Sequence, residues 1–531
     1  MDRAKSSPRP DFGTIRVMHL AKPLMMTTLC LSLLSGCGLP PLDNRSVSRA
    51  LTPEASQDTA LGRAIAPLAA GHPGKSGIHP LPDAYDAFAA RMLLARAAQR
   101  SLDVQYYIWH KDMTGTMLLE ALHEAADRGV RVRLLLDDNG TSGLDEELSA
   151  LDAHPNIEVR LYNPFVLRWP KPLGYVTDFR RLNRRMHNKS FTADNQATII
   201  GGRNIGDEYF GAASGVLFTD LDVLSIGAVV NDVSVDFDRY WASDSAYPVD
   251  RLLKKTDPGE LDELEQAAAR VERSPEAAAY AEAMRKLPFI QQLLRGELTL
   301  EWADTRMVSD DPRKTLGTAP PEAMLPHQLH EILGTPTTDL ELVSPYFVPT
   351  AVGTESFGQM ARSGVKVKVL TNALEATDVA VVHSGYAKRR KDLLASGVEL
   401  YEMKRMGAEV ERNKSMGPFG SSGSSLHAKT FAVDGRRIFV GSFNFDPRSA
   451  KLNTELGFVI DSPTLARHIA DAFDKDIPRS AYRVCLDDKG QLYWLEQRNG
   501  DTIRHDTEPG TTVWQRLSVW FVSLLPLEPL L

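Results

Sequence analysis

Apolar and polar residues follow helical and strand periods in a fixed order soon after residue 80. Residues 84–99 carry apolar side chains at helical spacing, and residues 102–109 form an apolar run that predicts a strand. A second helical stretch at 116–127 is closed by Gly129, and residues 130–136 predict a second strand. This order predicts a β-α-β unit and therefore an α/β fold.

The same unit returns further along the chain. Residues 340–347 repeat the first strand at an offset of 238 (340 against 102), and residues 364–370 repeat the second at an offset of 235 (364 against 129). A nearly constant offset indicates that a whole domain is duplicated. We therefore predict two tandem α/β/α sandwich domains, at 81–250 and 326–480, whose equivalent edges face each other across a pseudo-twofold axis. The acidic, alanine-rich sequence within 251–325 predicts a helical connector between them.

A set of polar residues repeats in register with this duplication. His, Lys, Asp, a Gly-Gly or Gly-Ser pair and Asn recur at offsets 0, +2, +7, +14 to +15 and +17, and the two copies start 240 residues apart. Histidine and lysine two positions apart on a strand project from one face, and a turn at the glycines can return the asparagine to that face. Each copy thus directs an imidazole, an ammonium and an amide toward a common point. The copies are His187, Lys189, Asp194, Gly201, Gly202 and Asn204, and His427, Lys429, Asp434, Gly441, Ser442 and Asn444.

Both copies resemble the signature of the phospholipase D superfamily. The sequence at 102–109, 180–189 and 444–449 is similar to that of bacterial cardiolipin synthases, most closely those of the C type, and the resemblance runs from about residue 81 to the C-terminus. It implies two phospholipase D-like domains that form a pseudo-dimer with one shared active site. It also implies a phosphatidyltransferase that needs no cofactor. Such an enzyme makes cardiolipin from phosphatidylglycerol and a second phospholipid, for which phosphatidylethanolamine is a candidate.

The resemblance assigns roles within the two motifs. His187 would attack phosphorus and form a phosphohistidine, and His427 would serve as general acid and base, although the residues alone do not distinguish the two. Lys189, Lys429 and the two asparagines would bind the non-bridging oxygens. Because the two ammonium groups would repel a cation, we expect no metal ion.

The resemblance also places an acidic residue against each histidine. Glu455 and Asp222 each open an apolar strand downstream of a motif, and Asp220, on the same strand face, is the alternative to Asp222. Asp194 and Asp434 fall five residues after each lysine, on the opposite strand face, which favours a structural role for them. The full candidate catalytic set is His187, Lys189, Asp194, Asn204, Asp222, His427, Lys429, Asp434, Asn444 and Glu455.

Several arginines lead directly into the first motif. Arg184 and Arg185, together with Ser442 in the second motif, are candidates for binding the lipid phosphate. Guanidinium groups pair with phosphate through two parallel hydrogen bonds. Solvated charges on a helix are the alternative for the arginines.

The charge and the cysteine content of the chain limit the classes of partner that we expect for it. The net charge of -8 and the pI near 6.0 weigh against nucleic-acid binding and thus against a nuclease. The three cysteines supply neither a disulfide framework nor a Cys-x-x-Cys metal spacing. The resemblance to cardiolipin synthases implies phospholipids and a membrane as the partners.

The N-terminal 37 residues have the layout of a secretory leader. Basic residues precede an apolar run at 24–34, which is too short to span a bilayer. The Leu-Ser-Gly-Cys sequence that ends at Cys37 resembles a bacterial lipobox and implies a lipid on that cysteine. A disposable leader or an uncleaved anchor, with no lipid on Cys37, is the alternative. Residues 38–80, rich in Pro, Ala, Gly and Ser, predict a tether. We expect a lipid-anchored protein of the bacterial cell envelope that faces the periplasm.

Three further segments have distinctive compositions. Residues 165–172 interleave apolar and basic side chains, and residues 511–525, within a C-terminal extension at 481–531, are apolar with few charges. Each predicts either a membrane-interface segment or an ordinary packed one. The glycine- and serine-rich residues 406–425 predict a flap over the second motif.

Two other functions compete with the transferase. A hydrolytic phospholipase D would share the chemistry, accept water instead of a lipid hydroxyl, and release phosphatidic acid. An inert envelope lipoprotein scaffold would keep the fold alone, and the presence of two complete motifs disfavours it.

Overall fold

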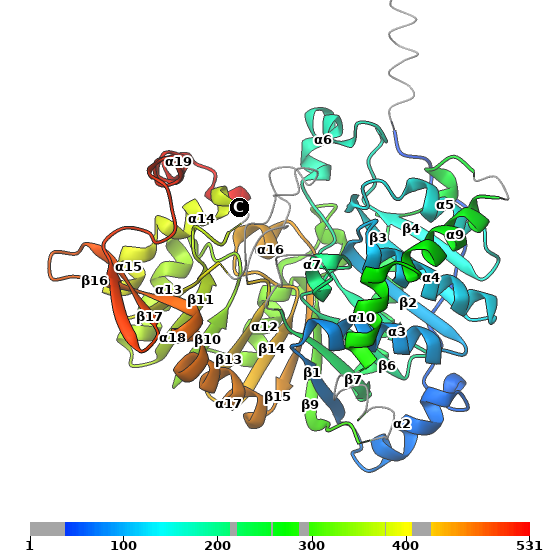
Figure 1. Cartoon of the computed structure of the whole chain (residues 1–531), viewed down its shortest axis with the longest axis horizontal. Coiled ribbons are helices and arrows are strands. Elements are labelled where there is room, and N and C mark those ends of the chain that lie inside the picture. The colour runs from blue at the N-terminus through cyan, green and yellow to red at the C-terminus, as the bar shows by residue number, and fades with distance from the viewer. Residues whose placement is uncertain are drawn as a thin grey trace, which may run out of the picture.

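The computed structural model describes residues 38–212, 220–255, 259–285, 292, 297–377, 379–405 and 426–531. Two α/β domains lie next to each other, and each is built on a mixed sheet with helices on both faces (Figure 1). The predicted pair of α/β/α sandwich domains is therefore confirmed.

The two sheets share one strand order. The first runs β1-β7-β6-β5-β2-β3-β4-β8 and the second runs β9-β15-β14-β13-β10-β11-β12-β16. In each sheet the three strands of the β-α-β units are parallel and their other neighbours are antiparallel. The strands of the first sheet are β1 (Ser76–Leu81), β2 (Ser101–Ile108), β3 (Arg131–Gly140), β4 (Ile157–Tyr162), β5 (Ser190–Ala193), β6 (Ala197–Gly201), β7 (Asp222–Gly227) and β8 (Ala246–Pro248). Those of the second are β9 (Glu301–Ser309), β10 (Asp339–Val343), β11 (Lys366–Asn372), β12 (Glu399–Met403), β13 (Thr430–Val433), β14 (Arg437–Gly441), β15 (Leu456–Asp461) and β16 (Ala481–Leu486).

Helices cover both faces of each sheet. In the first domain α3 and α4 pack on one face through Phe88 and Leu118, and α8 packs on the other through Phe237. In the second domain α13 and α15 pack on one face and α17 on the other. The helices are α3 (Ala84–Ala97), α4 (Met113–Asp127), α8 (Ala228–Trp241), α12 (Leu325–Leu333), α13 (Thr350–Arg362), α15 (Arg390–Ala395), α16 (Pro447–Lys451) and α17 (Pro463–Asp471).

The domains join through an apolar core and through strand β9. Residues 301–303 of β9 pair with β1 of the first sheet, and residues 304–309 pair with β15 of the second. Ile200 and Val223 of the first domain lie in the same buried cluster as Val440 and Phe458 of the second. The edges that carry the two motifs therefore meet at this interface.

The domain boundaries differ in three places from the ranges read from the sequence. The stretch 38–80, predicted to be a tether, holds helix α2 (Ala60–Ala70) and most of β1, which pairs with β7 of the first sheet. The stretch 251–325 holds the connector helices α9 (Glu260–Glu272) and α10 (Pro275–Arg285), but it also holds β9, which belongs to the second sheet. The second sheet continues past residue 480 through β16, the counterpart of β8. A hairpin, β17 (Leu492–Arg498) and β18 (Asp501–His505), then extends this sheet.

Exposed apolar side chains gather on two segments of the chain. One is α6 (Gly174–Leu182) with the loop before it, and the other is the C-terminal helix α19 (Val513–Ser523). The helices of both segments lie in the upper part of Figure 1. Across the part of the chain that the structure describes, no helix has the length and apolar character needed to cross a membrane. The leader, Cys37 and the predicted flap at 406–425 lie outside the described residues.

Candidate active site

The two motifs occupy equivalent positions in the two sheets. His187 and Lys189 lead into β5, and His427 and Lys429 lead into β13. The first motif is also joined directly to the second domain, because the His187 N–H donates to the carbonyl of Thr454 at 2.9 Å. The two histidine-bearing segments are thereby held together at the domain interface.

Each histidine hydrogen-bonds a carboxylate from the other domain. His187 Nδ1 lies 2.8 Å from Oε2 of Glu455, and His427 Nδ1 lies 2.6 Å from Oδ2 of Asp220. All four side chains are buried. Because an ionised carboxylate only accepts hydrogen bonds, it places the imidazole proton on Nδ1 and leaves Nε2 as the reactive nitrogen.

An aromatic ring fixes each imidazole from the side. Tyr107 packs edge-on against His187 at 5.1 Å between ring centroids, and Tyr209 packs edge-on against His427 at 5.3 Å. Both tyrosines come from the first domain. The sequence reading did not single out either residue, although Tyr107 lies in the strand at 102–109 that carries the family resemblance.

The two lysines lie beside the histidines. Lys189 Nζ donates to the carbonyl of His187 at 2.6 Å, and Lys429 Nζ lies 3.2 and 3.3 Å from the two ring nitrogens of His427. Burial and the positive charges of Lys189 and Lys429 lower the pKa of His187 well below its ordinary value. Burial and Lys429 likewise lower the pKa of His427 to about 4, and the opposing effect of Asp220 offsets this only in part. Since both lysines act on both histidines, the two motifs form one site.

The two carboxylates have different environments. Burial opposes ionisation of Asp220, but His427 and Lys429 outweigh it and hold the pKa of Asp220 below its ordinary value. Burial raises the pKa of Glu455 to about 7, although Lys189 and hydrogen bonds from two serine hydroxyls favour the ionised form. Those donors are Ser442 Oγ at 2.5 Å and Ser449 Oγ at 2.7 Å.

The two motif asparagines differ in their contacts. Asn204 accepts a hydrogen bond from the Ile108 N–H at 3.2 Å and donates to the hydroxyl of Tyr209 at 3.2 Å, so it braces the ring that contacts His427. Within the described residues, the buried Oδ1 of Asn444 has no hydrogen-bond partner. Asn444 is therefore the motif asparagine with unused hydrogen-bonding capacity at the site.

The expected role of Asp222 beside a histidine is wrong. Asp222 Oδ2 pairs with Arg91 Nη2 at 2.8 Å and with Arg203 Nη1 at 3.4 Å. Strand register gives the reason: Gly201 pairs with Asp222 in the first sheet as Gly441 pairs with Gly457 in the second. The counterpart of Glu455 is thus Asp220, two residues earlier, as the alternative reading had it.

All three candidate phosphate-binding residues have hydrogen-bond partners within the protein. The guanidinium of Arg185 is buried, pairs with Asp137 at 2.8 Å and donates to the carbonyl of Asn163 at 2.9 Å, so it holds the chain that leads to the motif. The Ser442 hydroxyl orients Glu455. The half-buried Arg184 donates to the carbonyl of Lys314 at 2.8 Å.

The motif aspartates have the contacts expected of structural residues. Asp194, at a positive φ of 53°, accepts hydrogen bonds from the backbone N–H groups of Arg100 at 2.7 Å and Ser101 at 2.9 Å, where β2 begins. Asp434, at a φ of 54°, accepts from the N–H groups of Thr337 and Thr338 before β10. Each aspartate ties the turn after its motif strand to the start of the neighbouring strand, away from the histidines.

The described residues include one group of potential metal ligands outside the motifs, formed by His110, Asp112 and Glu208. His110 Nδ1 lies 3.1 Å from Glu208 Oε1, and Asp112 caps α4 by accepting from the Gly115 N–H at 2.9 Å. The prediction that catalysis needs no metal stays a prediction.

The geometry suits an anionic substrate that undergoes substitution at phosphorus. Two lysines supply positive charge for the non-bridging oxygens, and two imidazoles can attack phosphorus and transfer a proton. Bringing these groups together in one buried site converts their reactions with a bound phosphodiester into effectively unimolecular steps.

Comparisons with known proteins agree with this geometry. The family model described as "Cardiolipin synthase, PLD-like domain" matches residues 93–241 and again 329–477. The chain is 50% identical to cardiolipin synthase C of Escherichia coli (strain K12) over 89% of this chain and 99% of that protein. It is also 32% identical to an uncharacterized protein of Helicobacter pylori (strain ATCC 700392 / 26695), over 88% and 92% of the two chains. The crystal structure of phosphatidylserine synthase from Haemophilus influenzae Rd KW20 shares the fold, with a TM-score of 0.54 at 14% identity over 89% of this chain and all of that one.

Proposed function

Because the chain belongs to the family of cardiolipin synthases with phospholipase D-like domains, we propose that it is a phosphatidyltransferase that makes cardiolipin. The acceptor is the free headgroup hydroxyl of phosphatidylglycerol, because cardiolipin carries two phosphatidyl groups on one glycerol. The donor is a second phospholipid, which is a second phosphatidylglycerol in the scheme below. The observation that carries the proposal is the exchange of carboxylates between domains, His187 with Glu455 and His427 with Asp220.

The first half-reaction forms a phosphohistidine. Lys189 and Lys429 offset the negative charge of the phosphodiester. The Nε2 lone pair of His187 forms a bond to phosphorus as the bond from phosphorus to the departing glycerol oxygen breaks. Protonated His427 gives its proton to that oxygen. Glu455, hydrogen-bonded to Nδ1, balances the positive charge that the His187 ring acquires.

In the second half-reaction His187 is the leaving group and His427 acts as the base. Neutral His427 removes the proton from the acceptor hydroxyl, whose oxygen bonds to phosphorus while the bond from phosphorus to His187 breaks. The lowered pKa of His427 is compatible with both steps. The bound anionic substrate favours the protonated form of His427. After the product leaves, the lowered pKa returns His427 to its neutral form. The products are cardiolipin and the regenerated enzyme.

The test uses the full-length protein in liposomes of phosphatidylglycerol and phosphatidylethanolamine, with products separated by mass. We expect cardiolipin, and we expect none from the matched His187→Ala protein. Phosphatidic acid without cardiolipin would support a hydrolase instead. No product from a folded wild-type protein would contradict both activities.

A membrane is the partner that the exposed apolar side chains favour. The loop before α6, α6 itself and α19 expose aromatic and aliphatic groups of the kind found at bilayer interfaces. These groups are Leu167, Trp169, Leu173, Val176, Phe179, Trp514, Trp520, Phe521 and Leu524. We propose that these segments rest in the headgroup region and that a lipid on Cys37 keeps the protein at a periplasm-facing membrane surface.

A further inference from the structure

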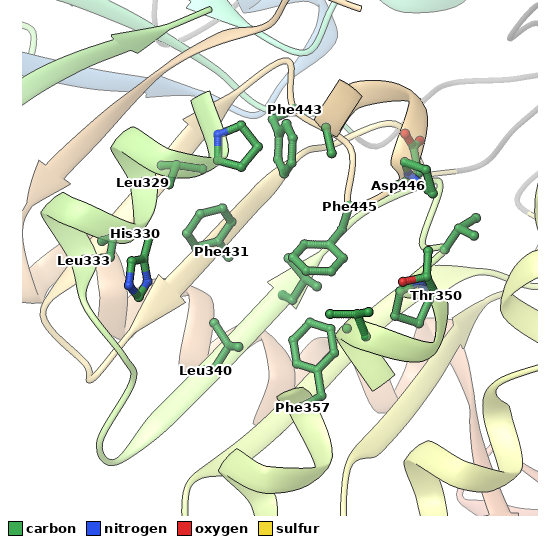
Figure 2. Close-up of a pocket in the computed structure, with 18 of the residues that line it drawn as sticks. Leu329, His330, Leu333, Leu340, Thr350, Phe357, Phe431, Phe443, Phe445 and Asp446 are labelled. Carbon is green, nitrogen blue, oxygen red and sulfur yellow. The ribbon is translucent and has the colours of Figure 1, made fainter. Parts of the chain in front are cut away.

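The second domain contains an apolar cavity behind its catalytic asparagine. The cavity has a volume of about 530 Å³ and lies between α12 and α13, over strands β10 and β13. Figure 2 shows the rings of Phe357, Phe431, Phe443 and Phe445 around it. Small-molecule sites typically have volumes of about 300 to 1,000 Å³.

The catalytic loop forms one wall of this cavity. Phe443 and Phe445 flank Asn444 and line the cavity, and the main chain of Phe445 forms an isolated β-bridge with that of Phe347. A ligand in the cavity therefore contacts the two side chains that position the second motif asparagine.

In the first domain, side chains occupy the position that is equivalent to this cavity. By motif spacing, Phe443 corresponds to Arg203, and by strand register Gly457 corresponds to Asp222. Arg203 and Asp222 form a buried ionic cluster with Arg91 of α3, and α10 lies over α3 through the contact of Tyr280 with Phe88. The duplication thus supplies an internal reference: the same fold buries charges in one copy and keeps an apolar space in the other.

The chemistry of the lining selects the ligand. Nearly all of the wall is hydrocarbon, and its few polar side chains include Asp446, which already caps α16 by accepting from the Ser449 N–H at 2.6 Å. An apolar cavity of this kind favours an apolar ligand over water. At the rim, exposed Lys451 offers a positive charge, and Thr350 holds a φ of 59°, unusual for a β-branched residue. Such backbone conformations concentrate at ligand sites.

From these observations we infer that the cavity binds one acyl chain of a membrane phospholipid and thereby couples the presence of lipid to the placement of Asn444. The identification of the lipid as a phospholipid rests on the proposed function. Lys451 offers a cation to the anionic phosphate of such a lipid, a contact that a neutral hydrocarbon could not make.

The variant that tests the inference fills the cavity from α13. Gly353 lines the cavity, and a Cβ added there would lie 3.3 Å from Pro349 Cβ and 3.7 Å from Phe445 Cε1. Gly353→Leu therefore adds a side chain to the cavity wall and requires a small shift of Pro349. Ala351→Leu adds the same side chain to the same helix at an exposed position outside the lining and is the matched control. Val352→Trp, at an exposed position on the rim, closes the mouth without altering the core and serves if Gly353→Leu fails to fold.

The probe is phosphatidylglycerol with a diazirine at the end of one acyl chain, in vesicles of phosphatidylglycerol and phosphatidylethanolamine, irradiated with the full-length protein. We expect the label, mapped by mass spectrometry, on the peptides that contain Phe443 and Phe445. The label should be lost from these peptides in Gly353→Leu or Val352→Trp and retained in Ala351→Leu. Label confined to α6 and α19, or unchanged in both filling variants, would overturn the inference.

The assay separates this inference from the proposed reaction. Labelling requires binding but no turnover, so it is expected in His187→Ala as well as in the wild type. Labelled cavity peptides in a protein that makes no cardiolipin would contradict only the proposed function. Cardiolipin synthesis without labelled cavity peptides would contradict only the acyl-chain site.

Discussion

His427 of the second domain hydrogen-bonds Asp220 of the first, with 2.6 Å between Nδ1 and Oδ2. The reciprocal pair, His187 with Glu455, crosses the same interface in the opposite direction. Neither domain alone contains a complete histidine–carboxylate pair. The duplicated fold is therefore needed for the chemistry itself, and strand β9, which pairs with both sheets, helps to hold the two halves in register.

Exchanging the two neighbouring aspartates for asparagine should separate catalysis from stability. Asp220→Asn removes the carboxylate that orients His427, and loss of such a partner lowers turnover by up to about 10⁴-fold. Asp222→Asn leaves the buried guanidinium groups of Arg91 and Arg203 without their anion, so we expect the free energy of unfolding to fall by about 3 to 5 kcal/mol.

The measurements are cardiolipin formation per folded molecule and chemical denaturation. Asp232→Asn, at an exposed position on α8, is the control and should change neither. Loss of activity without loss of stability in Asp222→Asn would contradict the assignment of Asp220 as the partner of His427 and of Asp222 as the partner of the two arginines.

The pH dependence of the reaction should respond to Lys429. A histidine whose pKa is lowered loses its acidic form at a lower pH, and Lys429 contributes to lowering the pKa of His427 to about 4. Removing this charge in Lys429→Met should raise that pKa. The descending, alkaline limb of kcat/KM should then move to higher pH, even though the rate itself falls. A limb that moves to lower pH, measured on the wild type and the variant in the same liposomes, would contradict the assignment of His427 as the acid.

The motif aspartates should affect stability rather than chemistry. Asp194→Ala leaves backbone N–H groups at Gln99, Arg100 and Ser101 without their acceptor. The group at Ser101 is buried, and a buried group left unsatisfied costs about 1 to 3 kcal/mol. We expect a lower Tm and near-normal activity of the folded fraction. Asp434→Ala is the matched comparison and should lose less stability, because Thr337 and Thr338 are exposed to water. Equal loss of activity in both variants at unchanged Tm would show a direct catalytic role.

The sequence was sufficient to predict the parts of the fold and site that repeat. The offset of 240 between His187 and His427, and the similar offsets of the β-α-β units, locate both domains and both motifs. Lysine two residues after histidine lies at the site in each copy, as strand alternation requires.

Features that depend on pairing between distant segments were not predictable from the sequence. The choice between Asp220 and Asp222 depends on the register of β6 with β7, which the apolar pattern does not specify. The sequence alone predicts a phosphate ligand at Arg185, because its partner, Asp137, lies 48 residues earlier, just after the apolar run of β3. Strand β9 was missed because its side chains are mostly exposed or half-buried and give weak alternation.

Lipid attachment at Cys37 has a direct test in cells. Cys37→Ala should abolish labelling by a fatty-acid analogue and leave the precursor unprocessed, because a lipobox cysteine is both the acceptor and part of the cleavage signal. The wild-type chain expressed at the same level is the control. Normal processing of the variant would indicate an ordinary leader or none.

The central claim, that His187 carries the phosphatidyl group while His427 supplies the proton, has its most direct test in a donor with a good leaving group. One general acid contributes about 10²- to 10⁴-fold, so His427→Ala should be slow with phosphatidylglycerol. Phosphatidyl-p-nitrophenol needs no proton on its leaving group. With it, His427→Ala should form an acid-labile phosphoenzyme that turns over slowly, and His187→Ala should form none. Phosphoenzyme in His187→Ala instead would reverse the two roles, and normal cardiolipin synthesis by both variants would contradict the shared two-histidine site.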